Sequence, residues 1–308
     1  MKIKSSPEDF IVKEVLPEGF IKESGEFEVY SLVKRLANTL DCIKVIKKEW
    51  ATEDIGYCGL KDKHGVTTQY LTVKKGREFA HNNFKVRYVG KAGKHLERGG
   101  NLGNDFIITL QVTPEEIALI RRNESRVKLG YTNFFDVQRT SRELPHISFT
   151  HYLLEGDYKT ALLRYYINKS KLSNSRVKSA YKECFKNWDD PVKCYSMLKG
   201  LVSELVLRPL KEAGVSGDYF NAIKKIPPSE LELLVAGHQA LLWNNNPTVK
   251  LPVVNLPLFK IKRAGTRELK VKPSNLKISY SNDEVIVSFF LPKGAYATIL
   301  IKELFKVT

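Results

Sequence analysis

Short runs that alternate apolar and polar residues dominate the first third of the chain and predict β-strands. Residues 9–15 (DFIVKEV) and 26–33 (EFEVYSLV) alternate with a period of two. Residues 66–74 (VTTQYLTVK) are rich in β-branched side chains. A fourth strand is predicted from the alternating apolar residues Phe106, Ile108, Leu110 and Val112.

Two helices are predicted among these strands. The first has Thr39 as its N-cap, and Lys44, Lys47 and Lys48 lie on its polar face. Its apolar stripe is Leu40, Ile43, Ile46 and Trp50. The second begins at residues 113–116 (TPEE), which combine a capping threonine with proline and acidic residues in the first turn.

The pattern becomes helical and strongly basic from about residue 142. Residues 230–243 (ELELLVAGHQALLW) predict a buried helix, and residues 246–257 a proline-rich linker or extended segment. A strand over residues 283–291 and a helix over 295–305 then return to the earlier pattern. We therefore expect a domain whose parts, residues 1–141 and 251–308, flank an inserted helical domain at 142–250.

Charge changes the picture more than composition does. The 308 residues include 43% hydrophobic residues, enough for a core, and 50 Lys and Arg against 34 Asp and Glu, a net charge of +16. Such an excess indicates a polyanionic partner. An anionic membrane surface would fit too, but the sequence has no basic amphipathic helix or lipidation signal. The four cysteines lack metal-ligand spacing, and no export signal is present, so we expect no metal and a cytoplasmic protein.

One carboxylate stands out in the segment GYCGLKDKHGVTTQ, residues 56–69. Asp62 lies between Lys61 and Lys63 in a glycine-bounded turn, and neighbouring cations favour its ionised form. An ionised carboxylate suits a nucleophile or a general base. Aspartate and glycine are also ordinary residues of a solvated turn, so the segment alone leaves both interpretations open.

Five segments in the same order resemble the TruD family of tRNA pseudouridine synthases. GLKDKHGVTTQ (59–69) is similar to the segment that carries the catalytic aspartate of the family, at the position of Asp62. The others are KSSPEDF (4–10), GNDF (103–106), NFFDVQR (133–139) and LPKGAYAT (291–298). QALLWN (239–244) resembles a family helix, with Ala240 where serine is usual. Asp136 replaces the usual glycine, and Thr140 and Ser141 stand where Phe-Gly is common.

The resemblance implies an α+β protein with the pseudouridine synthase fold, a mixed and largely antiparallel central sheet, and an inserted, mainly helical TRUD-type domain. It implies an isomerase with Asp62 as the catalyst and a flipped-out uridine. The same resemblance places Phe10, Asn133 and Tyr296 in the base pocket, with Phe135 as a further aromatic face and Lys4 beside the carboxylate. The expected RNA contacts are Lys61, Lys63, Gln138, Arg139, Lys91 and Lys94.

The expected partner is tRNA, and the isomerisation requires no cofactor. Lys85, Arg87 and Arg98 join Lys91 and Lys94 around a glycine-rich turn at residues 90–103, where phosphate contacts would position the RNA. A non-catalytic RNA-binding protein or RNA chaperone on the same fold is the alternative, and a nucleic-acid-binding module of unrelated fold is a third. The sequence leaves open the oligomeric state, the role of Asp62 as nucleophile or base, and which uridine is modified, at position thirteen of tRNA or elsewhere.

Overall fold

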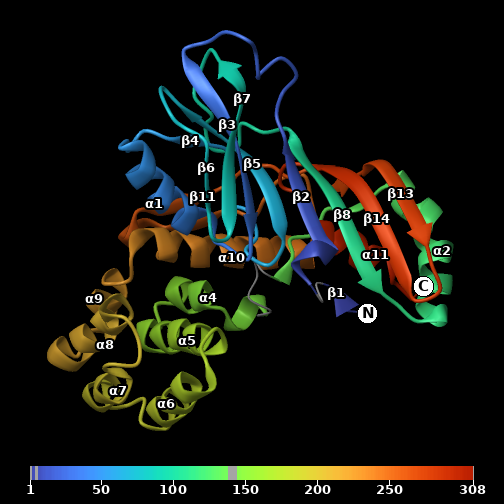
Figure 1. The fold of residues 1–308 in the computed structure, drawn as a ribbon. Helices are drawn as coiled ribbons and strands as arrows, with labels where there is room; N and C mark the ends of the chain where they lie inside the picture. The colour runs from blue at the N-terminus through green and yellow to red at the C-terminus, as the bar shows by residue number, and fades with distance from the viewer. Residues whose placement is uncertain (1, 4–5, 138–143, 308) are drawn as a thin grey trace. The chain divides into compact units, whose positions relative to one another are not determined.

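The computed structural model describes residues 2–3, 6–137 and 144–307. The chain divides into two compact units, which are described separately below. Unit 1 is Met1–Asn133 with Lys270–Thr308, and unit 2 is Phe134–Leu269. These units end near residues 133 and 269, whereas the domains expected from the sequence end at 141 and 250, so that domain division stays a prediction. Figure 1 shows the chain coloured from its N-terminus to its C-terminus.

Unit 1 is built on one mixed sheet. Its strands run in the order β13-β14-β8-β2-β5-β3-β7-β6, with β1 paired to β8 and β4 to β5. The strands are β1 Lys2–Ile3, β2 Phe10–Val15, β3 Phe27–Arg35, β4 Gly56–Tyr57, β5 Val66–Val73, β6 Phe79–His81, β7 Phe84–Ala92, β8 Gly103–Gln111, β13 Ser274–Tyr280 and β14 Glu284–Pro292. The strands predicted from period-two alternation are therefore confirmed.

The pairing of β2 with β5 decides where the Asp62 turn lies. Among the described strands of this sheet these two run parallel, with Ile11 opposite Val66, and the other neighbouring pairs are antiparallel. Two parallel strands start at the same edge of the sheet. The turn that leads into β5 therefore lies beside the start of β2, and the predicted mixed, largely antiparallel sheet is confirmed.

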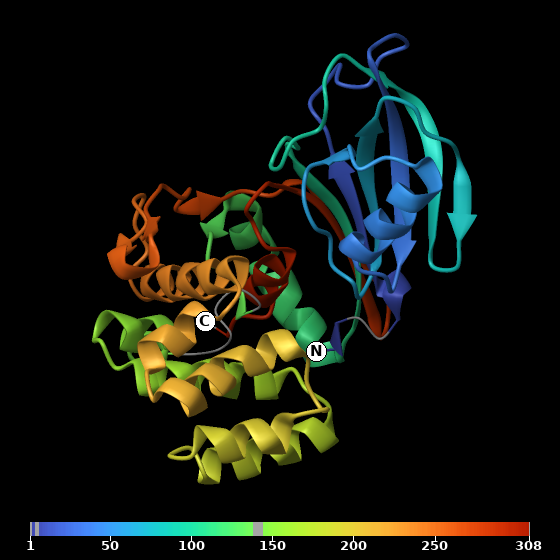
Figure 2. The ribbon, with the colours of Figure 1, turned by 90° about the vertical axis from the view of Figure 1, so that its left-hand side faces the viewer.

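Helix α1 (Thr39–Trp50) packs on the sheet over β3, β5 and β7 (Figure 2). Its buried face includes Cys42, Ile43 and Ile46, which join a core with Leu32 and Leu71. Two details of the prediction were wrong. Asn38 rather than Thr39 is the N-cap residue, because the Thr39 hydroxyl is used by other contacts, and Leu40 is 49% exposed while Cys42 takes its place in the core.

Helices α2 (Pro114–Leu129) and α11 (Ala297–Leu304) are tied together by polar contacts. Thr113 and Glu116 form a capping box at the start of α2, which confirms the predicted start. The Arg126 guanidinium donates to the Glu303 carboxylate at 2.5 Å and to its carbonyl oxygen at 2.6 Å. Asn123 donates to the carbonyl of Leu304 at 3.1 Å, so α2 satisfies acceptors at the end of α11. A short pairing of β9 (Tyr131–Thr132) with β12 (Lys270–Val271) completes unit 1.

Unit 2 is mainly helical, as the sequence predicts. Its helices are α4 Phe149–Leu154, α5 Tyr158–Lys171, α6 Ser175–Lys186, α7 Pro191–Leu198, α8 Glu204–Ser216, α9 Tyr219–Lys224 and α10 Pro228–Asn245. A two-stranded sheet of β10 (Val254–Leu256) and β11 (Ile261–Arg263) follows, so the predicted linker includes a strand. The core around Tyr165, Tyr166 and Tyr181 is rich in aromatic contacts.

Candidate active site

Asp62 lies in the turn between β4 and β5, in a segment without helix or strand. Its side chain is partly buried, whereas those of Lys63 and His64 are exposed. The Asp62 Oδ1 accepts a hydrogen bond from the backbone nitrogen of His64 at 3.2 Å. This local contact favours the turn conformation.

The side chain of Lys34 holds the backbone of this turn. Lys34 belongs to β3 and is only 1% exposed. Its Nζ donates to the carbonyl oxygens of Asp62 at 2.6 Å and Lys61 at 3.3 Å. Burial lowers the pKa of Lys34, because desolvation disfavours the ammonium form, while the charges of Cys42 and Asp62 act in the opposite direction. The peptide groups on either side of the Asp62 α-carbon therefore have a fixed anchor.

Lys61 reaches inward rather than toward solvent. Its side chain is 10% exposed, and its Nζ lies 2.6 Å from Oε1 of Glu14, whose side chain is fully buried. The same Nζ donates to Oδ1 of Asn104 at 2.7 Å. Glu14 Oε2 accepts from the backbone nitrogen of Tyr70 at 3.1 Å. The Lys61 ammonium group therefore has partners inside the protein, and Lys63 is the exposed lysine beside Asp62. The expected contact of Lys61 with RNA stays a prediction.

A chain of neutral hydrogen bonds holds the other side of the turn. The backbone nitrogen of Lys61 donates to Thr39 Oγ1 at 3.0 Å, and the Thr39 hydroxyl donates to Gln69 Oε1 at 3.0 Å. Gln69 Nε2 completes the chain by donating to the carbonyl of Gly59 at 3.3 Å. Helix α1, strand β5 and the turn are joined by these bonds, which explains why threonine occupies the first position of α1.

Gly65 brings the end of the turn against Phe10. A Cβ atom at Gly65 would lie 2.5 Å from the carbonyl oxygen of Phe10 and 3.1 Å from its Cδ1, which is too close for any other residue. The Phe10 ring meets Phe106 edge to face, with 6.2 Å between ring centroids. Phe10 is 5% exposed, so its side chain is buried.

The remaining expected site residues fall into three groups. Asn133 is buried and follows β9, and Tyr296 is the partly buried residue that precedes α11; both belong to unit 1. Phe135 belongs to unit 2, where the Arg267 guanidinium lies 3.8 Å from its ring centroid and Asn244 binds its backbone. Lys4, Gln138, Arg139, Thr140 and Ser141 lie outside the described residues. The assignment of these residues to a base pocket stays a prediction.

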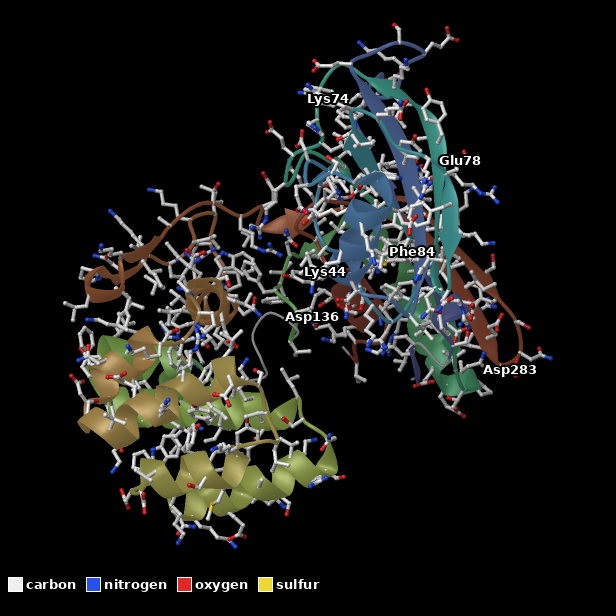
Figure 3. All side chains as sticks on the ribbon, turned by 60° about the vertical axis from the view of Figure 1, so that its left-hand side comes forward. Lys44, Lys74, Glu78, Phe84, Asp136 and Asp283 are labelled. Carbon is white, nitrogen blue, oxygen red and sulfur yellow. The ribbon has the colours of Figure 1, made fainter. Side chains whose placement is uncertain are left out.

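Asp136, which stands where the family usually has glycine, is a buried residue of unit 2 and is labelled in Figure 3. Of the expected surface lysines, Lys91 lies on β7 and Lys94 in the exposed loop that follows it. Lys85 and Arg87 also extend from β7, so part of this basic cluster belongs to a strand rather than to a turn.

A surface cavity of about 570 Å³ lies at the end of α1. It is lined by Lys44, Lys47, Lys48, Ala51, Thr52 and Glu53. Lys47 is paired with Glu53 at 2.7 Å, and Lys44, which Figure 3 labels on this helix, is exposed with Lys48. The cavity is therefore open and positively charged.

The described residues form neither a metal-binding cluster nor a membrane-spanning helix. Across residues 2–3, 6–137 and 144–307, His, Cys, Asp and Glu side chains form no group of three or more that could hold a metal ion. The described helices also include none that is both long and apolar enough to cross a membrane.

Sequence reasoning missed Lys34, Glu14, Thr39, Gln69 and Asn104 as parts of the site. A signal was present in the alternation of the strands. Lys34 continues the buried positions Tyr30 and Leu32 of β3, and Glu14 continues Phe10 and Val12 of β2. A charged residue in register with a buried face is unusual and indicates a specific partner.

Comparison with known proteins identifies the family. The family model described as tRNA pseudouridine synthase D (TruD) matches residues 1–251 and 252–304. The chain belongs to the TruD family. The resemblance seen in the five motifs is thus confirmed.

Two proteins named tRNA pseudouridine synthase D illustrate how similar the relatives are. The TruD relative from Leptospira interrogans is 32% identical over 256 residues, which cover 79% of this chain and 62% of that protein. The relative from Aquifex aeolicus is 26% identical, with 99% of this chain and 98% of that protein covered. The chain spans about 60% of the length of the curated relatives that are 31–32% identical to it.

A solved structure supports the fold. The crystal structure of a TruD protein from Methanosarcina mazei superposes with a TM-score of 0.76 and 20% identity, covering 100% of this chain and 94% of that one. The expected α+β fold with a mixed central sheet and a helical region is therefore confirmed.

Proposed function

We propose that this protein is a tRNA pseudouridine synthase that uses Asp62 to isomerise a uridine in tRNA. Family membership supports the reaction class. The observation that carries the assignment of Asp62 is its turn, whose backbone is held by Lys34, by the Lys61–Glu14 pair and by the Thr39 hydroxyl. A catalytic group must be held close to its productive geometry, and an ordinary solvated turn needs no such support.

The proposed reaction requires one carboxylate and a pocket for the base. The bond between uracil N1 and the ribose C1′ breaks, and a bond between uracil C5 and C1′ forms. The proton on C5 is released to solvent, and N1 takes up a proton, so the conversion is redox-neutral. The ionised Asp62 either attacks C1′ or removes a proton from the sugar, and both roles require the charged form.

A uridine must leave its stack before Asp62 can reach it, which costs a few kcal/mol. Aromatic faces recover about 1–3 kcal/mol for each stacked base. Phe10 and Tyr296 are the proposed aromatic partners, and the Asn133 amide can both donate to and accept from the uracil edge. The contact of Gly65 with Phe10 supports this proposal for Phe10, because it joins that residue to the Asp62 turn.

The tRNA phosphates would meet exposed lysines of unit 1. Lys63 lies next to Asp62, and Lys94 is exposed beyond β7. The cavity on α1 adds Lys44 and Lys48, and α1 starts at the Thr39 that binds the Asp62 turn. Lys44 and Lys48 lie 5 and 9 positions after Thr39, which corresponds to roughly 8–14 Å along the helix. One or two nucleotides of RNA would span this distance.

Release of tritium from tRNA carrying tritium at uracil C5 tests the proposal. The wild-type protein should release the label, and Asp62→Asn should lower the rate at least a thousandfold because the amide is neither a base nor a nucleophile. Binding of the same tRNA to Asp62→Asn should stay within threefold of wild type.

Asp283→Asn is the matched control. Asp283 is an exposed turn aspartate between β13 and β14, labelled in Figure 3. The Asp283→Asn variant should release tritium at the wild-type rate. Equal release by wild type and Asp62→Asn would refute the role of Asp62. Tight tRNA binding with no release by wild type would favour the non-catalytic RNA-binding alternative.

A further inference from the structure

Lys34 occupies a position that the alternation of β3 assigns to the core. The residues two and four positions before it, Leu32 and Tyr30, pack in the apolar cluster under α1. Lys34 is 1% exposed, and within the described residues it forms no ion pair with a carboxylate. Its Nζ instead donates to two carbonyl oxygens, those of Lys61 and Asp62.

Burying an ammonium group without a carboxylate at ion-pair distance lowers the stability of a protein. Carbonyl oxygens satisfy its hydrogen bonds but do not neutralise its charge. A methionine of similar length would fill the same space at lower cost. The contacts made by Nζ all lead to the Asp62 turn, so the benefit that offsets this cost has to be sought in that turn.

We propose that Lys34 is a positioning residue that holds the Asp62 turn in its working geometry and keeps its carboxylate ionised. The first part follows from the two hydrogen bonds, which fix the peptide groups before and after the Asp62 α-carbon. The second follows from charge, because a nearby cation favours a carboxylate over the carboxylic acid. The inference about catalysis rests on the proposed function.

Lys61 cannot supply this charge in the same way. Its Nζ lies against Glu14 at 2.6 Å, so the two charges largely cancel. The titratable groups that face Lys34 are Cys42 on α1 and Lys61 and Asp62 in the turn. Among the described residues near Asp62, Lys34 is therefore the buried cation whose charge no ion-pair partner cancels.

Hydrogen exchange of the turn is the first test, and it does not depend on activity. Lys34→Met removes the charge and both hydrogen bonds while keeping an apolar chain of similar length. Backbone amides of residues 59–65 should exchange at least tenfold faster in this variant than in wild type. Leu32→Ala is the control, because it weakens the same strand without touching the turn. Unchanged exchange in Lys34→Met, or an equal increase in Leu32→Ala, would overturn the anchoring role.

The single-turnover rate of tritium release is the second test. With tRNA saturating, Lys34→Met should be about a hundredfold slower than wild type, since a misplacement near 1 Å costs this much. The acid limb of its pH–rate profile should move to higher pH, while tRNA affinity and the rate of Leu32→Ala stay near wild type. A lower affinity with an unchanged saturated rate and pH profile would contradict the proposal.

Two further outcomes are separable. If wild type releases no tritium, the proposed function fails, and the exchange data alone decide whether Lys34 anchors the turn. If Lys34→Met does not fold, Lys34→Gln, which keeps a polar end but is too short to reach both carbonyls, takes its place. Failure of both variants to fold would show that Lys34 serves folding and would overturn the positioning role.

Discussion

Unit 1 and the helical part of unit 2 bury different kinds of polar groups. Around the Asp62 turn, unit 1 buries the charged side chains of Lys34 and Glu14, with Lys61 nearly buried beside them. From Ser148 to the end of α10, the buried polar side chains of unit 2 carry no fixed charge. They are Ser148, Thr150, His238 and Gln239.

The pair of Ser148 and His238 shows how unit 2 avoids charge. The Ser148 hydroxyl lies 2.7 Å from His238 Nδ1 and accepts from the backbone nitrogen of His151, which caps α4. Burial, with a smaller effect from the charge of His151, lowers the pKa of His238 to about 4, so this histidine is neutral at pH 7. Neutral polar groups suffice in this helical core, whereas the buried charges of Lys34 and Glu14 lie around the Asp62 turn.

Breaking the charged pair in unit 1 should have the larger effect on stability. Glu14→Gln leaves the Lys61 ammonium group buried without its counter-ion, which costs about 3–5 kcal/mol of unfolding free energy. Urea unfolding at pH 7 measures it. Glu183→Gln, which removes an exposed pair with Lys186 on α6, should change stability much less.

A double substitution separates stability from function at the same pair. Glu14→Met combined with Lys61→Met removes both charges, so most of the lost stability should return. Tritium release should remain slow, because the turn has lost the contacts with Glu14 and Asn104. Recovery of both stability and activity would mean that the charges of the Glu14–Lys61 pair have no role in the site.

The neutral pair in unit 2 predicts a pH-dependent loss of stability. The pKa of His238 is near 6.5 in the unfolded chain and about 4 in the folded protein, so protons favour the unfolded state. The stabilisation is complete above pH 6.5 and is lost as the pH falls toward 4, by about 3 kcal/mol in all. Urea unfolding at pH 7.0, 5.5 and 4.5 measures this slope for wild type and His238→Gln. An equal slope in the variant would show that other groups cause it.

Removing the exposed lysines of the α1 cavity should weaken tRNA binding without changing folding. This is the smallest of the expected effects. Lys44→Gln with Lys48→Gln should weaken tRNA binding and reduce the slope of log affinity against log salt by about two, one for each lost phosphate contact. The single-turnover rate at saturating tRNA should not change. Fluorescence anisotropy at several salt concentrations measures the slope.

Lys270→Gln with Lys277→Gln removes the same charge from exposed positions on β12 and β13. This control should leave the salt slope closer to wild type. Identical slopes for the two double variants would show that the α1 cavity is no preferred phosphate site.

Most of the fold could be predicted from local patterns. Period-two alternation located β2, β3, β8 and β14, and the TPEE start signal located α2. The error at Thr39 has a long-range cause. Its hydroxyl is taken by Lys61 and Gln69, residues 22 and 30 positions away, which no local pattern contains.

The site was less accessible to sequence reasoning for the same reason. Motifs indicated Asp62, Phe10 and the GNDF segment, but the support of the turn comes from β2, β3, β8 and α1 through contacts such as Lys34 to Asp62 and Lys61 to Asn104. These contacts depend on strand register. The lysine at a core position of β3 was a visible anomaly, and only the structure supplied its partner.

Mapping of pseudouridine in tRNA from three cell lines tests the central claim most directly. The lines would lack the gene, carry the wild-type gene, or carry Asp62→Asn at matched protein levels. At least one tRNA uridine should be converted with wild type and remain uridine in the other two, and its position would identify the substrate site. Conversion of the same uridine by Asp62→Asn, or no difference between wild type and the deletion, would contradict the assignment of Asp62 as the catalyst of a tRNA pseudouridine synthase.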